Sequence, residues 1–224
     1  MSNKVVFLTT IFPTEEKFLE DFFESLVNQT YTNFDIVVVN DGYENFNKIK
    51  SQFSTLTIIE LPYRNTPVKN REHGINFCKA NDYNILIFGD CDDFFSNNRI
   101  EKSVDLLSNY DIVVNDLSLF NDSGIYEICY FSNRIANNSE IEYSFIKDKN
   151  IFGLSNTAIN LKIINKVNFP LGEEIVDWYF YKKLLSEGNS SIFTNETETY
   201  YRQYENNYAG LDSINGKYPL WWEK

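Results

Sequence analysis

The chain has 224 residues, of which 43% are hydrophobic and 17% aromatic, so it can bury a sizeable core and is neither disordered nor of low complexity. It carries 20 Lys and Arg against 32 Asp and Glu, which gives a net charge of −12. Such an acidic chain has no general attraction for polyphosphate, and this disfavours a nucleic-acid-binding protein. No linker rich in Pro, Gly or Ser divides the sequence, so we expect one continuous domain over residues 1–224.

The cysteines and the apolar runs bear on where the protein works. Cys78, Cys91 and Cys129 have no metal-ligand spacing, and we expect reduced thiols. The N-terminal apolar run is too short for a signal peptide, and nowhere do about 18 apolar residues run together as a transmembrane helix would require. We therefore expect a cytoplasmic protein, with association at the inner face of the membrane and formation of a homodimer left open.

In the first half, short apolar runs alternate with amphipathic stretches. The runs predict strands at Val5–Leu8, Ile36–Val39, Leu56–Leu61 and Tyr83–Phe88. Between them, apolar residues recurring from Phe18 to Val27 predict one helix, and Arg71–Ala80 predicts another. This alternation is typical of βαβ units, so we expect an α/β fold with a mostly parallel central sheet flanked by helices.

The rest of the chain is less regular. Helices are predicted at Asn98–Leu107, Ser139–Ile146 and Asp177–Leu185. Strands are predicted at Asp111–Val114, Tyr126–Phe131, Ser191–Thr194 and Glu198–Tyr201.

Acidic residues directly follow two predicted strands. Asn40-Asp41-Gly42 comes after the second strand, and Gly89-Asp90-Cys91-Asp92-Asp93 comes after the fourth. Ligands of parallel sheets bind beyond the carboxyl ends of the strands. Clustered carboxylates repel one another unless a cation neutralises them, and oxygen ligands suit Mg²⁺ or Mn²⁺. The alternative is a solvated loop whose acids cap the next helix.

These residues, with four further stretches, resemble the family 2 glycosyltransferases of GT-A fold. Ser25-Leu26-Val27-Asn28-Gln29-Thr30-Tyr31 is similar to the end of the family's first helix, and Asp41-Gly42 to its "D-D-G" loop. Arg71-Glu72-His73-Gly74-Ile75 resembles "R-N-x-G-I", and Asp90–Asp93 resembles the "D-x-D-D" metal motif. Val176-Asp177-Trp178 looks like the helix that holds the catalytic base, and Tyr201–Asn207 is similar to a late "Y-R-x-H" segment.

The resemblance implies a single Rossmann-like GT-A domain whose residues 1–110 bind a nucleotide sugar and whose residues 111–224 bind an acceptor. The implied reaction is inverting transfer of a sugar from a nucleotide diphosphate sugar, most simply a UDP-sugar, to a glycan or glycolipid hydroxyl in bacterial surface glycan synthesis. Asp177 is implied as the general base, and Asp92 with Asp90 as ligands of a divalent cation (Mn²⁺ or Mg²⁺). The residues implied to bind the nucleotide sugar are Thr10, Ile11, Phe12, Asp41, Arg71, Asp90, Cys91 and Arg202.

Departures from the family pattern leave alternatives open. Val176 stands where the family has Glu, Tyr204 where it often has a metal-assisting His, and Ile11-Phe12-Pro13-Thr14 where it has "P-x-Y-N". The loss of the Glu and of the His favours a non-catalytic homologue that binds a nucleotide sugar or a protein partner, whereas Asp177 argues against it. A nucleotidyltransferase would carry a Gly-rich loop after the first strand, which this chain lacks.

Purely structural roles for several of these residues also stay open. Asp177 is also compatible with a place at the start of a helix alone, in which case Glu173 or Glu174 is the next candidate for the base. Asp41 is compatible with turn chemistry alone, and Arg71 with pairing to nearby acids such as Glu72 alone. We expect His73 to be structural and Tyr204 to pack or hydrogen-bond, and Trp221-Trp222 to be either core or an exposed platform.

Overall fold

The first four long strands form the parallel part of the sheet, as the apolar runs predict. The computed structural model describes residues 3–170, 172 and 175–204. In it β1 (Val5–Ile11), β2 (Phe34–Asn40), β3 (Ile58–Pro62) and β4 (Ile85–Phe88) pair in parallel in the order β3-β2-β1-β4. These strands are apolar on both faces because helices cover both sides of the sheet.

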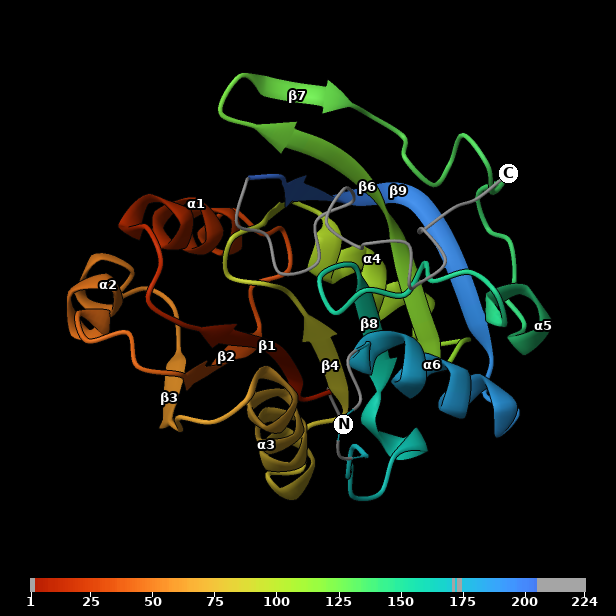
Figure 1. The fold of residues 1–224 in the computed structure, drawn as a ribbon, viewed down its shortest axis with the longest axis horizontal. Coiled ribbons are helices and arrows are strands. Elements are labelled where there is room, and N and C mark those ends of the chain that lie inside the picture. Colours follow the sequence, from red (N-terminus) through yellow and green to blue (C-terminus); the bar gives the residue numbers. More distant parts are fainter. Residues whose placement is uncertain (1–2, 171, 173–174, 205–224) are drawn as a thin grey trace.

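Alternate residues of each strand face two separate cores. Val6 and Leu8 pack in one core and Val5 and Phe7 in the other. The first core is covered by α3 (Pro67–Ala80), α5 (Tyr143–Ile146) and α6 (Val176–Ser186), and the second by α1 (Glu16–Val27), α2 (Phe46–Gln52) and α4 (Arg99–Leu106). Figure 1 shows α3 and α6 in front of the sheet and α4 behind it.

The other half of the sheet mixes strand directions. It contains β5 (Phe94–Phe95), β6 (Ile112–Asn121), β7 (Gly124–Glu127), β8 (Thr157–Asn160) and β9 (Ser191–Arg202), and a 3₁₀ turn, η1 (Leu161–Ile163), follows β8. The order continues from β4 through β8, β6 and β9 to β5, and β7 pairs with β6. Only β6 and β9 are parallel here, so the sheet is mixed but largely parallel.

Several sequence predictions for this half need correction. The strand predicted to stop at Val114 runs on to Asn121, because Asn115 hydrogen-bonds to Thr199 inside the sheet and so can be buried. The two predicted late strands are one strand, β9, whose pairing with β6 jumps from Thr194 to Glu198.

Two more differences concern segments that the sequence patterns misjudged. The predicted strand Tyr126–Phe131 is extended only as far as Glu127, since the Phe131 amide instead donates to Asp116 over 2.7 Å. Strand β8, in the middle of the sheet, was not predicted. Among the described residues no helix is long and apolar enough to cross a membrane.

Candidate functional site

The two acidic loops flank the carboxyl end of β1. The Asp41 amide donates to the Ile11 carbonyl over 2.8 Å, and the Gly89 amide donates to the Leu8 carbonyl over 3.2 Å. The loops after β2 and β4 therefore meet at one edge of the sheet, as their positions after neighbouring parallel strands predict. We call residues 90–93 the acid loop.

Asp90 and Asp92 of the acid loop have different partners. Oδ1 of Asp90 lies 3.2 Å from Nη2 of Arg71 on α3. Oδ2 of Asp92 accepts a hydrogen bond of 2.8 Å from the Tyr204 hydroxyl. The expectation that Tyr204 packs or hydrogen-bonds is thus confirmed, and the nearby acid that pairs with Arg71 is Asp90 and not the Glu72 given as an example.

Asp93 is a structural member of the acid loop, because its side chain is fully buried. Its Oδ1 accepts from the Arg202 amide over 2.9 Å, and its Oδ2 accepts from the Ser155 hydroxyl. The same Ser155 oxygen accepts from the Asp90 amide over 3.3 Å. Ser155 thus ties the acid loop to the segment before β8, a contact that no sequence pattern indicated.

The electrostatics of the acid loop favour a cation. Burial and then the neighbouring Asp90 raise the pKa of Asp92, while the Tyr204 hydrogen bond lowers it. The described residues hold no cluster of three or more His, Cys, Asp or Glu side chains that could ligate a metal. Mg²⁺, however, takes one or two carboxylates and completes its shell with water and substrate phosphates. The carboxylate oxygens of Asp90 and Asp92 suit this kind of Mg²⁺ coordination.

Asp177 lies in the first turn of α6, and Arg71 connects it electrostatically to the acid loop. Its Oδ1 accepts from the Trp178 amide over 2.7 Å and from Nδ2 of Asn150 over 3.5 Å. Burial raises the pKa of Asp177 and the positive charge of Arg71 lowers it. For Arg71, burial would lower the pKa, but Asp90 and Asp177 outweigh it and raise the value. Arg71 is therefore paired with Asp90, and its positive charge also acts on Asp177.

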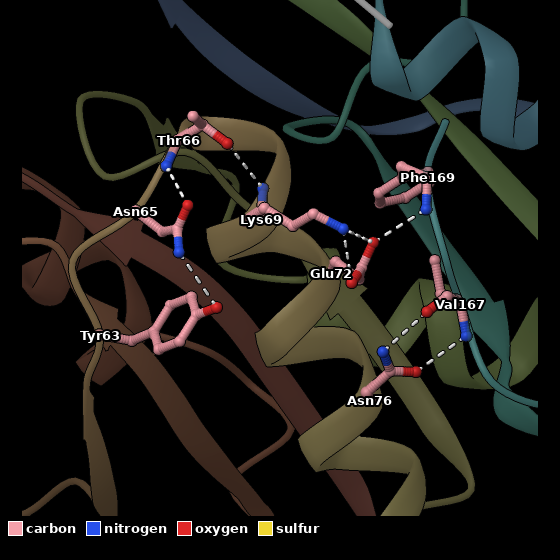
Figure 2. A network of polar contacts seen from close by, with 8 residues as sticks. All are labelled: Tyr63, Asn65, Thr66, Lys69, Glu72, Asn76, Val167 and Phe169. Carbon is pink, nitrogen blue, oxygen red and sulfur yellow. Dashed lines mark hydrogen bonds and ion pairs between the residues drawn. The ribbon is translucent and has the colours of Figure 1, made fainter. Parts of the chain in front are cut away.

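A polar network holds the segment before α6 against α3 (Figure 2). Oε2 of Glu72 accepts from the Phe169 amide over 2.9 Å and lies 2.9 Å from Nζ of Lys69. One turn further along, Asn76 donates to the Val167 carbonyl and accepts from the Val167 amide, both over 2.8 Å. The helix that presents Arg71 thus also anchors the chain that leads to Asp177.

Arg202 joins the acid loop to α1. Its Nε donates to the Asp92 carbonyl over 2.7 Å, and its Nη2 donates to Asp21 over 2.7 Å. The guanidinium lies between the rings of Phe18 and Phe120, 4.2 Å and 4.5 Å from their centroids. Only 5% of the residue is exposed. Its contact with the donor stays a prediction, and the structure adds a role in fixing the acid loop.

The other predicted donor-binding residues differ in how accessible their side chains are. Ile11 and Cys91 are buried in the core, so only their backbones are placed to meet a ligand. Thr10 is half-buried, as is Asp41, whereas Phe12 is 38% exposed. Burial also raises the pKa of the Cys91 thiol well above its usual value, which makes it unreactive.

The remaining sequence candidates fall into two groups. His73 stacks on Tyr63 with ring centroids 4.2 Å apart, which agrees with a structural role. Glu173, Glu174, Trp221-Trp222 and residues 205–207 lie outside the described residues.

Comparison with known proteins shows the family of the chain. The sequence pattern of Glycosyl transferase family 2 matches residues 10–159. The chain is 23% identical over 186 residues to an uncharacterized glycosyltransferase of Haemophilus influenzae, covering 79% of this chain and 70% of that protein. It is 24% identical over 219 residues to glycosyltransferase GlyA of Streptococcus pneumoniae, covering 90% of this chain and only 31% of that protein.

Solved structures share the fold at low identity. S. aureus TarS 1–349 in complex with UDP-GlcNAc is similar with a TM-score of 0.70 and 16% identity, over 92% of this chain and 60% of that one. GalNAc-T7 with UDP, GalNAc and Mn²⁺ is similar with a TM-score of 0.66 and 14% identity, over 97% of this chain and 47% of that one. These likenesses confirm the predicted α/β fold of GT-A type.

Proposed function

Because the chain belongs to glycosyl transferase family 2, we propose that it moves a sugar from a UDP-sugar to an acceptor hydroxyl with inversion at the anomeric carbon. One observation carries this proposal: Arg71 pairs with Asp90 and also interacts with Asp177. Asp90 suits a cation that binds a diphosphate, and Asp177 suits a proton. The positive charge of Arg71 acts on both carboxylates at the carboxyl end of the sheet. The complex of TarS with UDP-GlcNAc supports UDP as the nucleotide.

In this proposal each group of site residues has a separate role in the reaction. Asp90 and Asp92 would hold a divalent cation, which would neutralise charge on the departing diphosphate. Asp41 and the Thr10–Phe12 backbone line the nucleoside pocket. Asp177 accepts the acceptor's proton as the acceptor oxygen bonds to the anomeric carbon and the bond to phosphate breaks.

Two features of Asp177 suit it to act as a base. Burial raises the pKa of Asp177, which makes its carboxylate a stronger base than that of an exposed aspartate. The two hydrogen bonds it receives both end on Oδ1, and no described residue donates to Oδ2. That second oxygen is therefore the one we assign to the acceptor hydroxyl. We place the acceptor in bacterial surface glycan synthesis, as the family resemblance implies.

A non-catalytic homologue that keeps the nucleotide site is the second candidate. The observation that favours it is the Tyr204 hydroxyl on Asp92, which occupies one carboxylate oxygen. Turnover separates the two candidates, whereas nucleotide binding does not.

The test is a thermal-shift panel with UDP, GDP, TDP and CMP, each with Mn²⁺, Mg²⁺ or EDTA. A ligand that binds only the folded state raises the unfolding midpoint. We expect a metal-dependent rise with UDP that Asp92→Ala abolishes and that the exposed control Asp122→Ala keeps. No rise with any nucleotide, in a sample that unfolds cooperatively, would refute the donor site.

Release of UDP from UDP-GlcNAc then tests turnover. Asp177→Ala should keep the nucleotide-dependent rise in midpoint and lose UDP release. If the wild-type protein binds UDP with metal and releases none from any UDP-sugar and acceptor, the non-catalytic homologue is the better description.

A further inference from the structure

Asn150 is a buried amide whose carbonyl oxygen has no hydrogen-bond donor. The residue is 7% exposed and lies in the segment between α5 and β8. Its Nδ2 donates to Oδ1 of Asp177 over 3.5 Å, and within the described part of the chain nothing donates to its own Oδ1. A buried polar atom without a partner is costly, and native structures rarely keep one without a reason.

The orientation of this amide follows from charge. The opposite orientation would bring the Asn150 carbonyl oxygen against the Asp177 carboxylate, and two acceptors cannot bond to each other. The N–H group must therefore face Asp177, and the carbonyl is left unpaired as a result.

The segment that follows Asn150 is well packed and hydrogen-bonded. Loose packing therefore does not explain the unpaired oxygen. The side chain of Asn156 accepts from the Gly153 amide over 2.8 Å and donates to the carbonyls of Ile151 and Asn115. Phe152 stacks on Tyr181 of α6 with ring centroids 5.0 Å apart. A neighbouring asparagine in the same segment thus has both ends of its amide bonded, whereas Asn150 does not.

We propose that Asn150 is a positioning residue for Asp177: its N–H group fixes one carboxylate oxygen and leaves the other free for the acceptor hydroxyl. The inference rests on the proposed function, because it takes Asp177 as the base. The unpaired carbonyl lowers the stability of the fold, and this loss is the consequence of keeping the N–H group on Asp177. Removing the amide should therefore impair the base without weakening the fold.

A hydrogen bond to the ionised form also acts on proton affinity. The Asn150 contact is one of the interactions that lower the pKa of Asp177, against burial, which raises it. Losing the contact should raise the pKa further. The other charged or titratable groups that interact with Asp177 are Arg71 on α3, Asp90 after β4, Tyr181 on α6 and Tyr201 on β9.

The test compares Asn150→Leu, which is close in size and apolar, with the wild-type protein. Titration of ¹³C-labelled aspartate carboxyl carbons, with Asp177 assigned through Asp177→Asn, should show a higher midpoint for Asp177 in Asn150→Leu. The thermal midpoint should stay the same or rise. UDP release should fall at least tenfold at low pH, and its acidic limb should move to higher pH by the same amount as the NMR titration.

The control is Asn160→Leu, since the Asn160 amide is bonded to the carbonyls of Leu107 and Tyr110. This variant should lose thermal stability and leave the Asp177 titration unchanged. Should Asn150→Leu fail to fold, Asn150→Asp keeps the shape and replaces the donor with a second carboxylate, which should raise the Asp177 midpoint even more.

An unchanged Asp177 midpoint in these Asn150 variants would overturn the inference, as would a loss of thermal stability in Asn150→Leu as large as in Asn160→Leu. The NMR titration needs no turnover. A protein that never transfers sugar would thus refute the proposed function, and only the titration and stability results decide the role of Asn150.

Discussion

Replacing Arg202 by methionine removes the guanidinium that joins the acid loop to α1. The hydrogen bond from Nε to the Asp92 carbonyl is charge-assisted, which is worth about 1.5–3 kcal/mol. The two aromatic rings that enclose the guanidinium add roughly 0.5–1 kcal/mol each. Asp21 is one-third exposed and can be rehydrated, so the loss of its ion pair adds little. We expect Arg202→Met to lower the free energy of unfolding by about 2.5–5 kcal/mol, the sum of these contributions.

Urea unfolding followed by circular dichroism measures this loss, and the exposed ion pair of Lys48 with Glu16 provides the control. Lys48→Met removes the same charge at the surface and should leave the urea midpoint almost unchanged. The reasoning is refuted if Arg202→Met unfolds at the same urea concentration as the wild-type protein with the same m-value. Such a result would leave Arg202 free to serve the donor alone, as the family resemblance implies.

Three further results follow from the contacts around the site. Burial raises the pKa of Asp177, and a base must be ionised to act. The rate of UDP release should therefore fall with decreasing pH at a midpoint above the pKa of an ordinary aspartate, about 3.9. A rate that stays constant down to that pH would contradict the assignment. Glu72→Leu removes the acceptor of the Phe169 amide, so hydrogen exchange at that amide should become faster, while Glu72→Gln should largely preserve its protection. Gly74→Ala would place a methyl group 2.7 Å from Leu8 of β1, so α3 must shift and the free energy of unfolding should fall by roughly 1–3 kcal/mol; an unchanged urea midpoint would show that the helix has room there.

The parallel half of the fold could be predicted because its signals are local. Four apolar runs mark the strands, and the acids that follow two of them mark the ligand-binding edge of the sheet. Adjacent parallel strands bring these loops together whatever the details of the side chains. Asp41, Asp90 and Asp92 could therefore be placed at one edge from the sequence alone.

The half of the sheet with mixed strand directions could be predicted only in part, because polar residues interrupt its strands. Asn115 and Thr199 are both buried and are bonded to each other across 84 positions of sequence. A prediction based on runs of apolar residues ends a strand at each of these two positions. Strand β8 also begins and ends in polar residues, Thr157 and Asn160, whose partners lie in other elements.

The same limit applies to the candidate site. The acids and Arg71 can be recognised by residue type, and the motif order indicates Asp177. Nothing in the sequence distinguishes the fully buried Asp93 from the two acids beside it in the motif, since its burial depends on Ser155 and on the Arg202 amide. Asn150 is likewise one asparagine among many until its contact with Asp177 is known.

The ties on the acid loop have a consequence for the order of folding during synthesis. Arg202 reaches Asp21 across 181 positions of sequence, and Tyr204 reaches Asp92 across 112. The parallel strands β1 to β4 and their helices precede β9 in the chain, but the carbonyl and the carboxylate of Asp92 have no partner until Arg202 and Tyr204 have been made. Closing such long loops is slow because the entropy must be lost before the contacts form. A nascent chain halted before Arg202 should therefore hold a folded sheet around an acid loop that is not yet locked in place.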